Sequence, residues 1–302
     1  MKKEKVKKEK KTAINSPFRY AGGKFYARNL IMEHIPEHID YIEPFAGGGS
    51  IFFAKEKVEN NWLNDLDSEL VNVYIQIRDN SEELIKSLEG EQATKERHRW
   101  YKNEFKPKND LERAKRWYYL NRTSYSGIMN MTNCYWGYGD KYSMRPENWG
   151  ASIRRTAEKL EGVKFTSWDF EKVIEEAPDN SFLFIDPPYY NADQDKFYTC
   201  SFVLEDHLRL ERVLKKHSKR LRFMITYDNS VEVVELYKWI GLENIHEKEW
   251  NYTIARTDDQ KKGSDKEKKE KGTRGKGKEI FILNYKEVQD EVPKEEVLKL
   301  DL

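Results

Sequence analysis

The sequence has few cysteines and no long apolar run. Its 302 residues include two cysteines, at positions 134 and 200, which lie far apart and outside any Cys/His cluster. This usage excludes a disulfide framework and a zinc site, and it predicts a reducing, cytoplasmic compartment. No apolar run approaches the ~18 residues that span a bilayer. The N-terminus carries charge without the apolar core of a secretory signal, so we expect no membrane association.

The sequence also lacks a globally basic composition, since its formal net charge is +1. Any affinity for nucleic acid must therefore come from local clusters. Residues 1–15 are rich in lysine and predict a disordered basic arm. Residues 256–278 are rich in Lys, Glu and Gly and predict a mobile charged loop, with a C-terminal tail over 286–302. The length suits one large α/β domain with an insertion, or two domains.

What the chain does contain is an apolar run at 182–185 that stops at Asp186-Pro187-Pro188-Tyr189. The run has the length and β-propensity of a strand buried on both faces. Proline cannot donate to a sheet ladder, so the strand must end at Asp186. Ligands of open α/β sheets bind at the carboxyl ends of strands. There, Asp186 and the carbonyl of Pro187 can accept hydrogen bonds from an exocyclic amino group, and Tyr189 can stack on a planar base. The alternative is an ordinary Pro-Pro turn.

Residues 41–54 read as a strand, a glycine turn and a helix. The turn and the helix N-terminus predict a site for an acidic or polar ligand group. The spacing of Gly47 and Gly49 departs from the dinucleotide fingerprint, and no Gly-Lys-Ser/Thr follows, which argues against NAD, FAD and a P-loop. Asp65 ends the next predicted strand eighteen residues after Gly47, where a carboxylate can hold ribose hydroxyls. We therefore expect an adenosine-bearing cofactor without pyrophosphate, namely S-adenosylmethionine. The alternative for Asp65 is a helix N-cap, although Asp67 suits that role better.

Aromatic residues also precede a glycine turn near the N-terminus. Phe18 and Tyr20 come before Gly22-Gly23-Lys24, after which a helix runs to about residue 32 or 34. Paired glycines let a ligand approach the backbone closely. Alone, this pattern is a weak indication of function.

Residues 72–160 interrupt the alternation of strands and helices. Helical patterns cover about 68–90 and 92–122, and the second pattern is strongly basic. An aromatic, glycine-rich run follows it. Basic residues interleaved with aromatic and small polar residues suit contact with a nucleic-acid backbone and its bases. The alternative is a solvated helical face over a buried aromatic cluster.

After this stretch the alternation resumes. A short strand at 163–170 ends in Asp169-Phe170, and the buried strand and a helix at about 204–217 follow. Another strand covers 221–227, and segments 244–253 and 279–285 are typical of an antiparallel pair. The order predicts an α/β fold with a mostly parallel sheet.

In their order, these motifs resemble one family, the Dam-like, α-class amino-methyltransferases that modify adenine in DNA. The resemblance covers residues 16–285 and rests on Pro-Phe-x-x-x-Gly-Gly-Lys, Glu-Pro-Phe-x-Gly-Gly-Gly-Ser, Asn-Asp-x-Asp, Tyr-Leu-Asn-Arg-x-x-Tyr-x-Gly and Asp-Pro-Pro-Tyr. It implies a Rossmann-like methyltransferase fold, with a mostly parallel seven-stranded sheet and an antiparallel terminal hairpin. It also implies a catalytic domain over 16–71 and 161–285 and a mostly helical target-recognition insert over 72–160.

The resemblance implies transfer of a methyl group from S-adenosylmethionine to the N6 amino group of an adenine flipped out of double-stranded DNA. It implies no metal, and it leaves open a cognate restriction endonuclease as a partner. The implied catalytic residues are Asp186, Pro187, Pro188 and Tyr189. The implied cofactor-binding residues are Phe18, Tyr20, Gly23, Lys24, Glu43, Pro44, Phe45, Gly47, Gly49, Ser50, Asp65, Asp169, Phe170 and Asp186. The implied DNA-binding residues are Arg122, Tyr125, Ser126 and Asn130, with Tyr125 filling or propping the vacated base stack.

Several members of the family that read a short palindrome carry arginine where this chain has Asn130. Arginine suits guanine and asparagine suits adenine, so the resemblance does not imply that this chain reads the GATC site of those members. One rival is a methyltransferase for the amino group of cytosine, for RNA or for a protein glutamine. Another is a DNA-binding protein with a decayed cofactor pocket. Methylation of a cytosine ring carbon is excluded because it needs a Pro-Cys nucleophile, and neither Cys134 nor Cys200 follows a proline.

Overall fold

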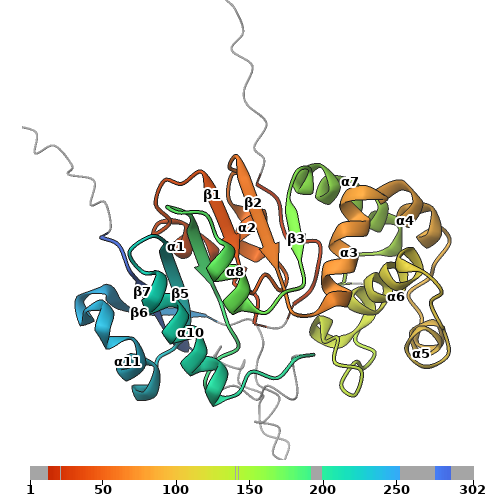
Figure 1. Ribbon diagram of the computed structural model, residues 1–302. Helices are drawn as coiled ribbons and strands as arrows, with labels where there is room; N and C mark the ends of the chain where they lie inside the picture. The colour runs from red at the N-terminus through yellow and green to blue at the C-terminus, as the bar shows by residue number, and fades with distance from the viewer. Residues whose placement is uncertain are drawn as a thin grey trace, which may run out of the picture.

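The computed structural model describes residues 13–20, 22–139, 141, 143–191, 199–251 and 276–286. Its strands are β1 Asp40–Glu43, β2 Asn60–Asn64, β3 Lys164–Thr166, β4 Phe182–Ile185, β5 Arg222–Asp228, β6 Ile245–Asn251 and β7 Lys276–Leu283. They form one seven-stranded sheet in the order β3-β2-β1-β4-β5-β7-β6 (Figure 1). Strands β1 to β5 pair in parallel, and β7 pairs antiparallel with both β5 and β6. The predicted sheet with its antiparallel terminal hairpin is therefore confirmed.

Side chains of the central strand β4 alternate between two apolar cores, one on each face of the sheet. Phe182 and Phe184 belong to one core, and Leu183 and Ile185 belong to the other. All four are buried. The prediction of a strand that is buried on both faces and ends before Asp186 is confirmed, as a parallel sheet covered on both sides requires.

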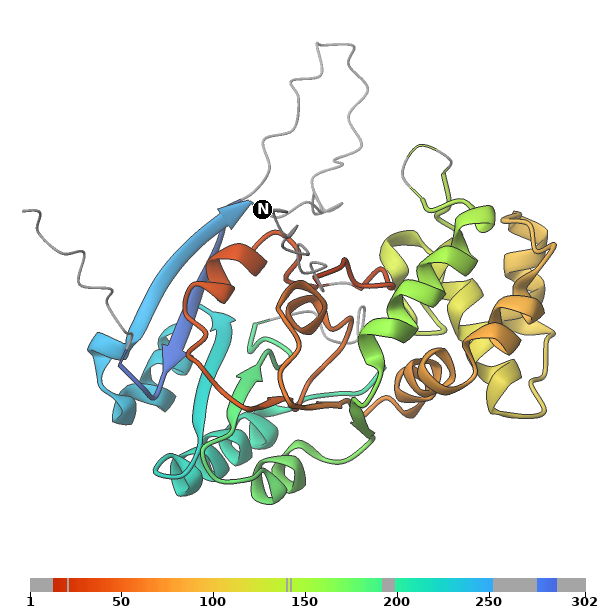
Figure 2. The same ribbon diagram turned by 90° about the horizontal axis from the view of Figure 1, so that it is seen from above.

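Helices cover both faces of the sheet (Figures 1 and 2). The α-helices are α1 Arg28–Met32, α2 Ser50–Ala54, α3 Ser68–Asp79, α4 Ser81–Leu88, α5 Lys95–Asn103, α6 Asp110–Thr123, α7 Trp149–Leu160, α8 Phe170–Glu176, α10 Leu204–His217 and α11 Val231–Tyr237. Short 3-10 turns are η1 Tyr125–Gly127, η2 Pro146–Asn148, η3 Lys238–Ile240 and η4 Leu242–Asn244. Helices α8, α10 and α11 pack on the face of Leu183, whereas α1, α2 and α3 pack on the face of Phe182.

The two long helical patterns in the middle of the chain are each divided in two. The pattern over 68–90 forms α3 and α4, which meet at Asn80 with φ −134° and ψ 40°. The pattern over 92–122 forms α5 and α6, separated by a stretch that contains Pro107. Proline lacks the N–H that a continuous helix would need and disfavours helical geometry in the residue before it.

Helices α4 to α7 gather beyond β3 at one side of the molecule in both views (Figures 1 and 2). Helix α3 crosses the predicted domain boundary at residue 72, because it is the connection that leads away from β2. Its Tyr74 stacks on Phe165 at a centroid distance of 5.4 Å and meets Phe18 at 4.8 Å. The helices and the sheet therefore share one core on this side. The division into a catalytic domain and a recognition insert stays a prediction.

The structure describes only the inner ends of the predicted charged segments. The N–H of Ile14 donates to the carbonyl of Phe53 at 2.8 Å, so residue 14 is part of the fold rather than of the arm predicted over 1–15. Strand β7 begins at Lys276, so the loop predicted over 256–278 ends before that residue. Residues 1–12, 252–275 and 287–302 lie outside the described residues. In the described part of the chain, no helix has the length and apolarity to cross a membrane.

Candidate active site

A pocket opens at the carboxyl ends of β1, β2 and β4, where the strand order reverses between β1 and β4. Ligands of open α/β sheets bind at such a switch point. Nearly all of the residues predicted to bind a cofactor meet here, although they come from distant segments. Those that line the pocket are Tyr20, Gly23, Lys24, Glu43, Pro44, Phe45, Gly47, Gly49, Ser50, Asp65, Asp169, Phe170 and Asp186.

Asp65 holds the glycine turn and does not cap a helix. Its Oδ2 accepts from the N–H of Gly47 at 2.8 Å, and its Oδ1 accepts from the N–H of Asp67 at 2.9 Å. Asp67 itself caps α3 by accepting from the N–H of Glu69 at 2.9 Å. Burial raises the pKa of Asp65 to about 6, against the opposing effect of its two donors. Gly47 has φ +47°, and a Cβ there would lie 2.9 Å from the Tyr20 ring, so the turn requires glycine.

The protein's own carboxylates occupy N–H groups of this turn and of α2. Besides Asp65, Glu43 accepts through Oε1 from the N–H of Phe52 at 2.9 Å and from the Tyr41 hydroxyl at 2.7 Å. Burial raises the pKa of Glu43 to about 8. Helix α2 has only five residues. Because the macrodipole is the sum of aligned peptide dipoles, so short a helix contributes little positive potential at its N-terminus. The site for an acidic or polar ligand group predicted at this turn therefore lacks two of its N–H donors, those of Gly47 and Phe52, and it stays a prediction.

Asp186 follows β4 and is held by two donors. Its Oδ1 accepts from the ammonium of Lys24 at 2.7 Å and from the hydroxyl of Thr226 at 2.7 Å. Lys24 is 5% exposed and Asp186 is 20% exposed, so the ion pair is largely withdrawn from water. Both contacts fall on the same oxygen. Since a carboxylate has two acceptor oxygens, Oδ2 is the one that a ligand amino group can use.

Two further carboxylates hold the tyrosines that follow Pro188. Oε2 of Glu279 accepts from the hydroxyl of Tyr189, and Oδ1 of Asp228 accepts from the N–H of Tyr190 at 2.9 Å. Asp228 and Glu279 are paired residues of β5 and β7. The sequence motifs do not indicate either residue. The available signal is positional: an acid that ends a parallel strand, and another that lies early in the adjoining antiparallel strand, meet at the same edge of the sheet.

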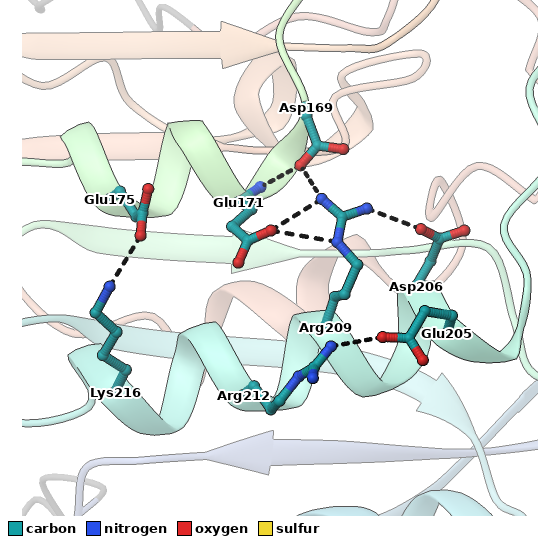
Figure 3. A network of polar contacts seen from close by, with 8 residues as sticks. All are labelled: Asp169, Glu171, Glu175, Glu205, Asp206, Arg209, Arg212 and Lys216. Carbon is teal, nitrogen blue, oxygen red and sulfur yellow. Dashed lines mark hydrogen bonds and ion pairs between the residues drawn. The ribbon is translucent and has the colours of Figure 1, made fainter.

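Arg209 of α10 ties three carboxylates together beside the pocket (Figure 3). Its Nη2 lies 2.7 Å from Oδ1 of Asp169 and 2.9 Å from Oε2 of Glu171, and its Nη1 lies 2.9 Å from Oδ1 of Asp206. Oδ1 of Asp169 also caps α8 by accepting from the N–H of Glu171 at 2.9 Å. In Figure 3 no dashed line joins the second oxygen of Asp169 to any of the residues drawn. Asp169 is thus oriented through contacts to one of its two oxygens.

Three phenylalanine rings form an apolar wall of the pocket. The Phe45 and Phe170 rings stack at a centroid distance of 5.4 Å, and Phe202 lies 5.6 Å from Phe45 and 5.7 Å from Phe170. Phe202 is outside the predicted site, although it follows the Ser201 that precedes α10. Other lining residues that were not predicted include Leu66, Trp168, Thr199, Cys200, Ser201 and Asp206.

Two predicted site residues lie in the core instead. Phe18 packs 4.7 Å from the Trp117 ring and does not line the pocket. Arg122 is 6% exposed, and its Nη1 donates to the carbonyl of Pro17 at 3.1 Å. This guanidinium fixes the N-terminal segment to α6 and cannot reach a phosphate without leaving the core. The cofactor contact predicted for Phe18 and the DNA contact predicted for Arg122 are therefore not supported.

The other DNA-binding candidates lie together after α6. Tyr125 is 46% exposed, and Ser126 has φ 53°. The side chain of Asn130 accepts from the N–H of Thr132 at 3.0 Å. A Cβ on Gly137 would lie 2.2 Å from the Cα of Tyr125, so this loop depends on glycine at that position.

A sheet of this order, with an Asp-Pro-Pro-Tyr segment and a carboxylate-rich pocket at its switch point, defines an α/β enzyme of the amino-methyltransferase class. The profile of the D12 class N6 adenine-specific DNA methyltransferases matches residues 20–254. The chain belongs to this family and is a site-specific DNA methyltransferase that acts on adenine. The family resemblance inferred from the motifs is confirmed.

Similar proteins include those of two bacteria and an archaeon. "Type II methyltransferase M1.LlaDCHI" of Lactococcus lactis subsp. cremoris is 32% identical over 91% of this chain and 98% of its own length. "Type II methyltransferase M.MjaIII" of Methanocaldococcus jannaschii is 26% identical over 76% of this chain and 90% of its own. The "DNA adenine methylase" of Escherichia coli K12 is 26% identical over 65% of this chain and 73% of its own.

Proposed function

We propose that the methyl donor is S-adenosylmethionine, bound in the pocket at the switch point. Among the described residues that line this pocket, Lys24 is the single Lys or Arg. The carboxyl groups that line it are Glu43, Asp65, Asp169, Asp186 and Asp206, of which Glu43 keeps its proton near neutral pH because burial raises its pKa to about 8. This lining suits a cationic sulfonium and ribose hydroxyls, whereas it would repel a pyrophosphate. The acidic lining, continuous with the catalytic tetrapeptide, is the observation that carries the proposal.

Within the pocket, Asp65 would accept hydrogen bonds from the ribose hydroxyls, because each carboxylate oxygen can accept more than one donor. The second oxygen of Asp169 would accept from the amino group of the cofactor adenine. Phe45 and Phe170 would contact the adenine ring, for which the apolar wall of phenylalanines is suited. The Gly47 turn would lie beneath the methionine part of the cofactor.

For the target adenine, Oδ2 of Asp186 and the carbonyl of Pro187 would accept from the two protons of the N6 amino group. S-adenosylmethionine, when bound, supplies an electrophilic methyl group. Hydrogen bonds to both amino protons draw the nitrogen lone pair out of conjugation and stabilise the positive charge that develops there. Alignment of the two reactants can contribute part of the ~7–11 kcal/mol available from positioning. Pro188 would keep the segment rigid, and Tyr189 would stack on the base.

The target base must leave the duplex to reach Asp186, at a cost of a few kcal/mol. We assign DNA recognition to the insert predicted over 72–160, with Tyr125, Ser126 and Asn130 at the interface. Tyr125 is exposed and aromatic, as a side chain that fills or props the vacated stack must be. Relatives named Type II methyltransferases suggest a cognate restriction endonuclease as a partner. Cleavage by such an endonuclease that prior methylation blocks would establish this partner.

One experiment tests the activity and its donor together. The protein is incubated with labelled S-adenosylmethionine and unmodified duplex DNA, which is then digested to nucleosides. We expect label in the nucleoside of N6-methyladenine only. Label in a cytosine nucleoside, or none, would contradict the proposal. Single-molecule sequencing of DNA from an expressing host then identifies the methylated site.

A further inference from the structure

Glu279 of β7 is a buried carboxyl group to which the proposed mechanism gives no role. The residue is 1% exposed. Its Oε2 accepts from the hydroxyl of Tyr189, while its Oε1 has no hydrogen-bond partner among the residues that the structure describes. An unsatisfied buried polar atom costs about 1–3 kcal/mol. A carboxyl group at this position therefore lowers stability. Its contact with the Tyr189 hydroxyl is the feature that can explain its presence.

That contact restrains the far end of the Tyr189 ring. The backbone of the same segment is held one residue later, where Asp228 accepts from the N–H of Tyr190 at 2.9 Å. The ring itself lies 4.8 Å from the Lys24 ammonium and 6.1 Å from the ring of Tyr227. Among these contacts of the Tyr189 ring, the hydrogen bond from its hydroxyl to Glu279 is the one with a preferred direction in the plane of the ring. Loss of this hydrogen bond would remove the restraint at the hydroxyl end of the ring while the backbone contact of Tyr190 stays in place.

We propose that Glu279 is a positioning residue for Tyr189, which by accepting the hydroxyl hydrogen bond fixes the ring in the orientation that stacks on the target adenine. The inference rests on the stacking role proposed above for Tyr189. Burial raises the pKa of Glu279 to about 7, and the Lys24 ammonium acts in the opposite direction. Glu279 thus belongs electrostatically to the site that contains Lys24, Asp186 and Asp228.

A double-mutant cycle tests the proposal with the full-length protein and duplex DNA. We expect Glu279→Ala to lower kcat about tenfold without changing cofactor affinity. A loss of this size is typical of the interaction energy between two residues in contact. Tyr189→Phe removes the same hydrogen bond from the other side and must lower kcat to a similar extent. When Glu279→Ala is added to the Tyr189→Phe variant, it should then cost nothing more. Glu279→Gln should restore most of the activity, because its amide oxygen can still accept from the hydroxyl.

A matched control is Glu247→Ala, which removes an exposed carboxylate from the neighbouring strand β6 and should leave kcat unchanged. Two results would overturn the positioning role. One is a double variant whose loss of kcat is the product of the two single losses, and the other is an equal loss of kcat in Glu279→Ala and Glu279→Gln. Full activity of Tyr189→Phe would do the same even if Glu279→Ala does not fold. Tyr189→Ala distinguishes failure of the proposed stacking role of Tyr189 from failure of the positioning role of Glu279. If it keeps full activity, the stacking role of Tyr189 is itself wrong; if it loses activity while the cycle shows no coupling, only the role of Glu279 fails.

Discussion

The ammonium of Lys24 lies 2.7 Å from Oδ1 of Asp186, so the N-terminal Gly-Gly-Lys turn is joined directly to the carboxylate that follows β4. Thr226 of β5 donates to the same oxygen at 2.7 Å. The two donors both contact Oδ1 and leave Oδ2 for the acceptor role that we propose toward the target amino group. The ion pair thereby connects a turn beside the cofactor pocket with the proposed site of methyl transfer.

Asp186→Ala should abolish turnover and leave cofactor affinity nearly unchanged. The acceptor is needed mainly in the transition state, so its loss appears in the chemical step rather than in binding. Single-turnover methyl transfer and calorimetry with S-adenosylmethionine measure the two quantities. The control is Asp179→Ala, whose carboxylate is 75% exposed and pairs with Arg220. An Asp186→Ala rate above about a tenth of wild type, a cost under ~1.4 kcal/mol, would contradict the assigned role.

Arg209→Gln should weaken cofactor binding, because Arg209 orients Asp169 through a 2.7 Å contact. We expect a loss on the order of 1 kcal/mol, about fivefold in affinity, since Asp169 keeps its backbone donor. Arg212→Gln on the same helix is the matched control (Figure 3). Arg212 is 63% exposed and pairs with Glu205 at 2.6 Å, and such surface pairs contribute about 0–1 kcal/mol to stability. Calorimetry that finds the same affinity for both variants would show that Asp169 needs no help from Arg209.

The end of the central strand and the glycine turn beside the pocket could be predicted because local chemistry specifies them. Pro187 lacks an N–H, so the strand before it must end at Asp186. Gly47 adopts φ +47°, which glycine reaches without strain, and the turn it forms lies at the end of β1. These signals lie within a few residues of the structures they determine.

Contacts between distant segments carried no such signal. Phe18 precedes the Gly-Gly-Lys turn as a pocket residue would, yet its ring is buried against Trp117. Arg122 ends a basic helix as a phosphate ligand would, yet α6 points it at the carbonyl of Pro17. Glu279 lies in a strand whose pairing with β5 decides that its side chain meets Tyr189. In each case the tertiary packing, which the local pattern does not contain, determines the partner.

Glu43 should give the fold a pH dependence of defined sign. Burial raises its pKa from 4.5 to about 8, so the folded protein keeps a proton here that the unfolded chain releases above its lower pKa. The resulting stability is fully present below the unfolded pKa of 4.5 and is lost as the pH rises through about 8. Relative to Glu43→Gln, which does not titrate, the free energy of unfolding should fall by about 1.4 kcal/mol per pH unit in this window. Urea unfolding of both proteins at about pH 5.5 and about pH 7.5 measures this difference. If the free energy of unfolding changes equally with pH in both proteins, folding does not shift the pKa of Glu43.

Gly137→Ala should displace Tyr125 and weaken DNA binding. A Cβ at 137 would lie 2.2 Å from the Cα and 2.4 Å from the nitrogen of Tyr125, and these are backbone atoms that cannot swing aside. The N–H of Gly137 donates to the carbonyl of Thr123 at 2.9 Å, so the glycine is also held from its other side. Loss of a base-stacking contact costs about 1–3 kcal/mol. Cofactor affinity should not change, because neither Gly137 nor Tyr125 lines the pocket.

The control for this change is Gly150→Ala in α7. There a Cβ would lie 3.3 Å from a side-chain methyl of Ile85, which can yield, and alanine favours the helix by about 1 kcal/mol. Titration of a fluorescent duplex with each variant measures DNA affinity, and calorimetry measures cofactor affinity. We expect Gly150→Ala to bind both ligands as wild type does. If Gly137→Ala also binds DNA like wild type, Tyr125 takes no part in the interface and the vacated stack must be filled by another residue.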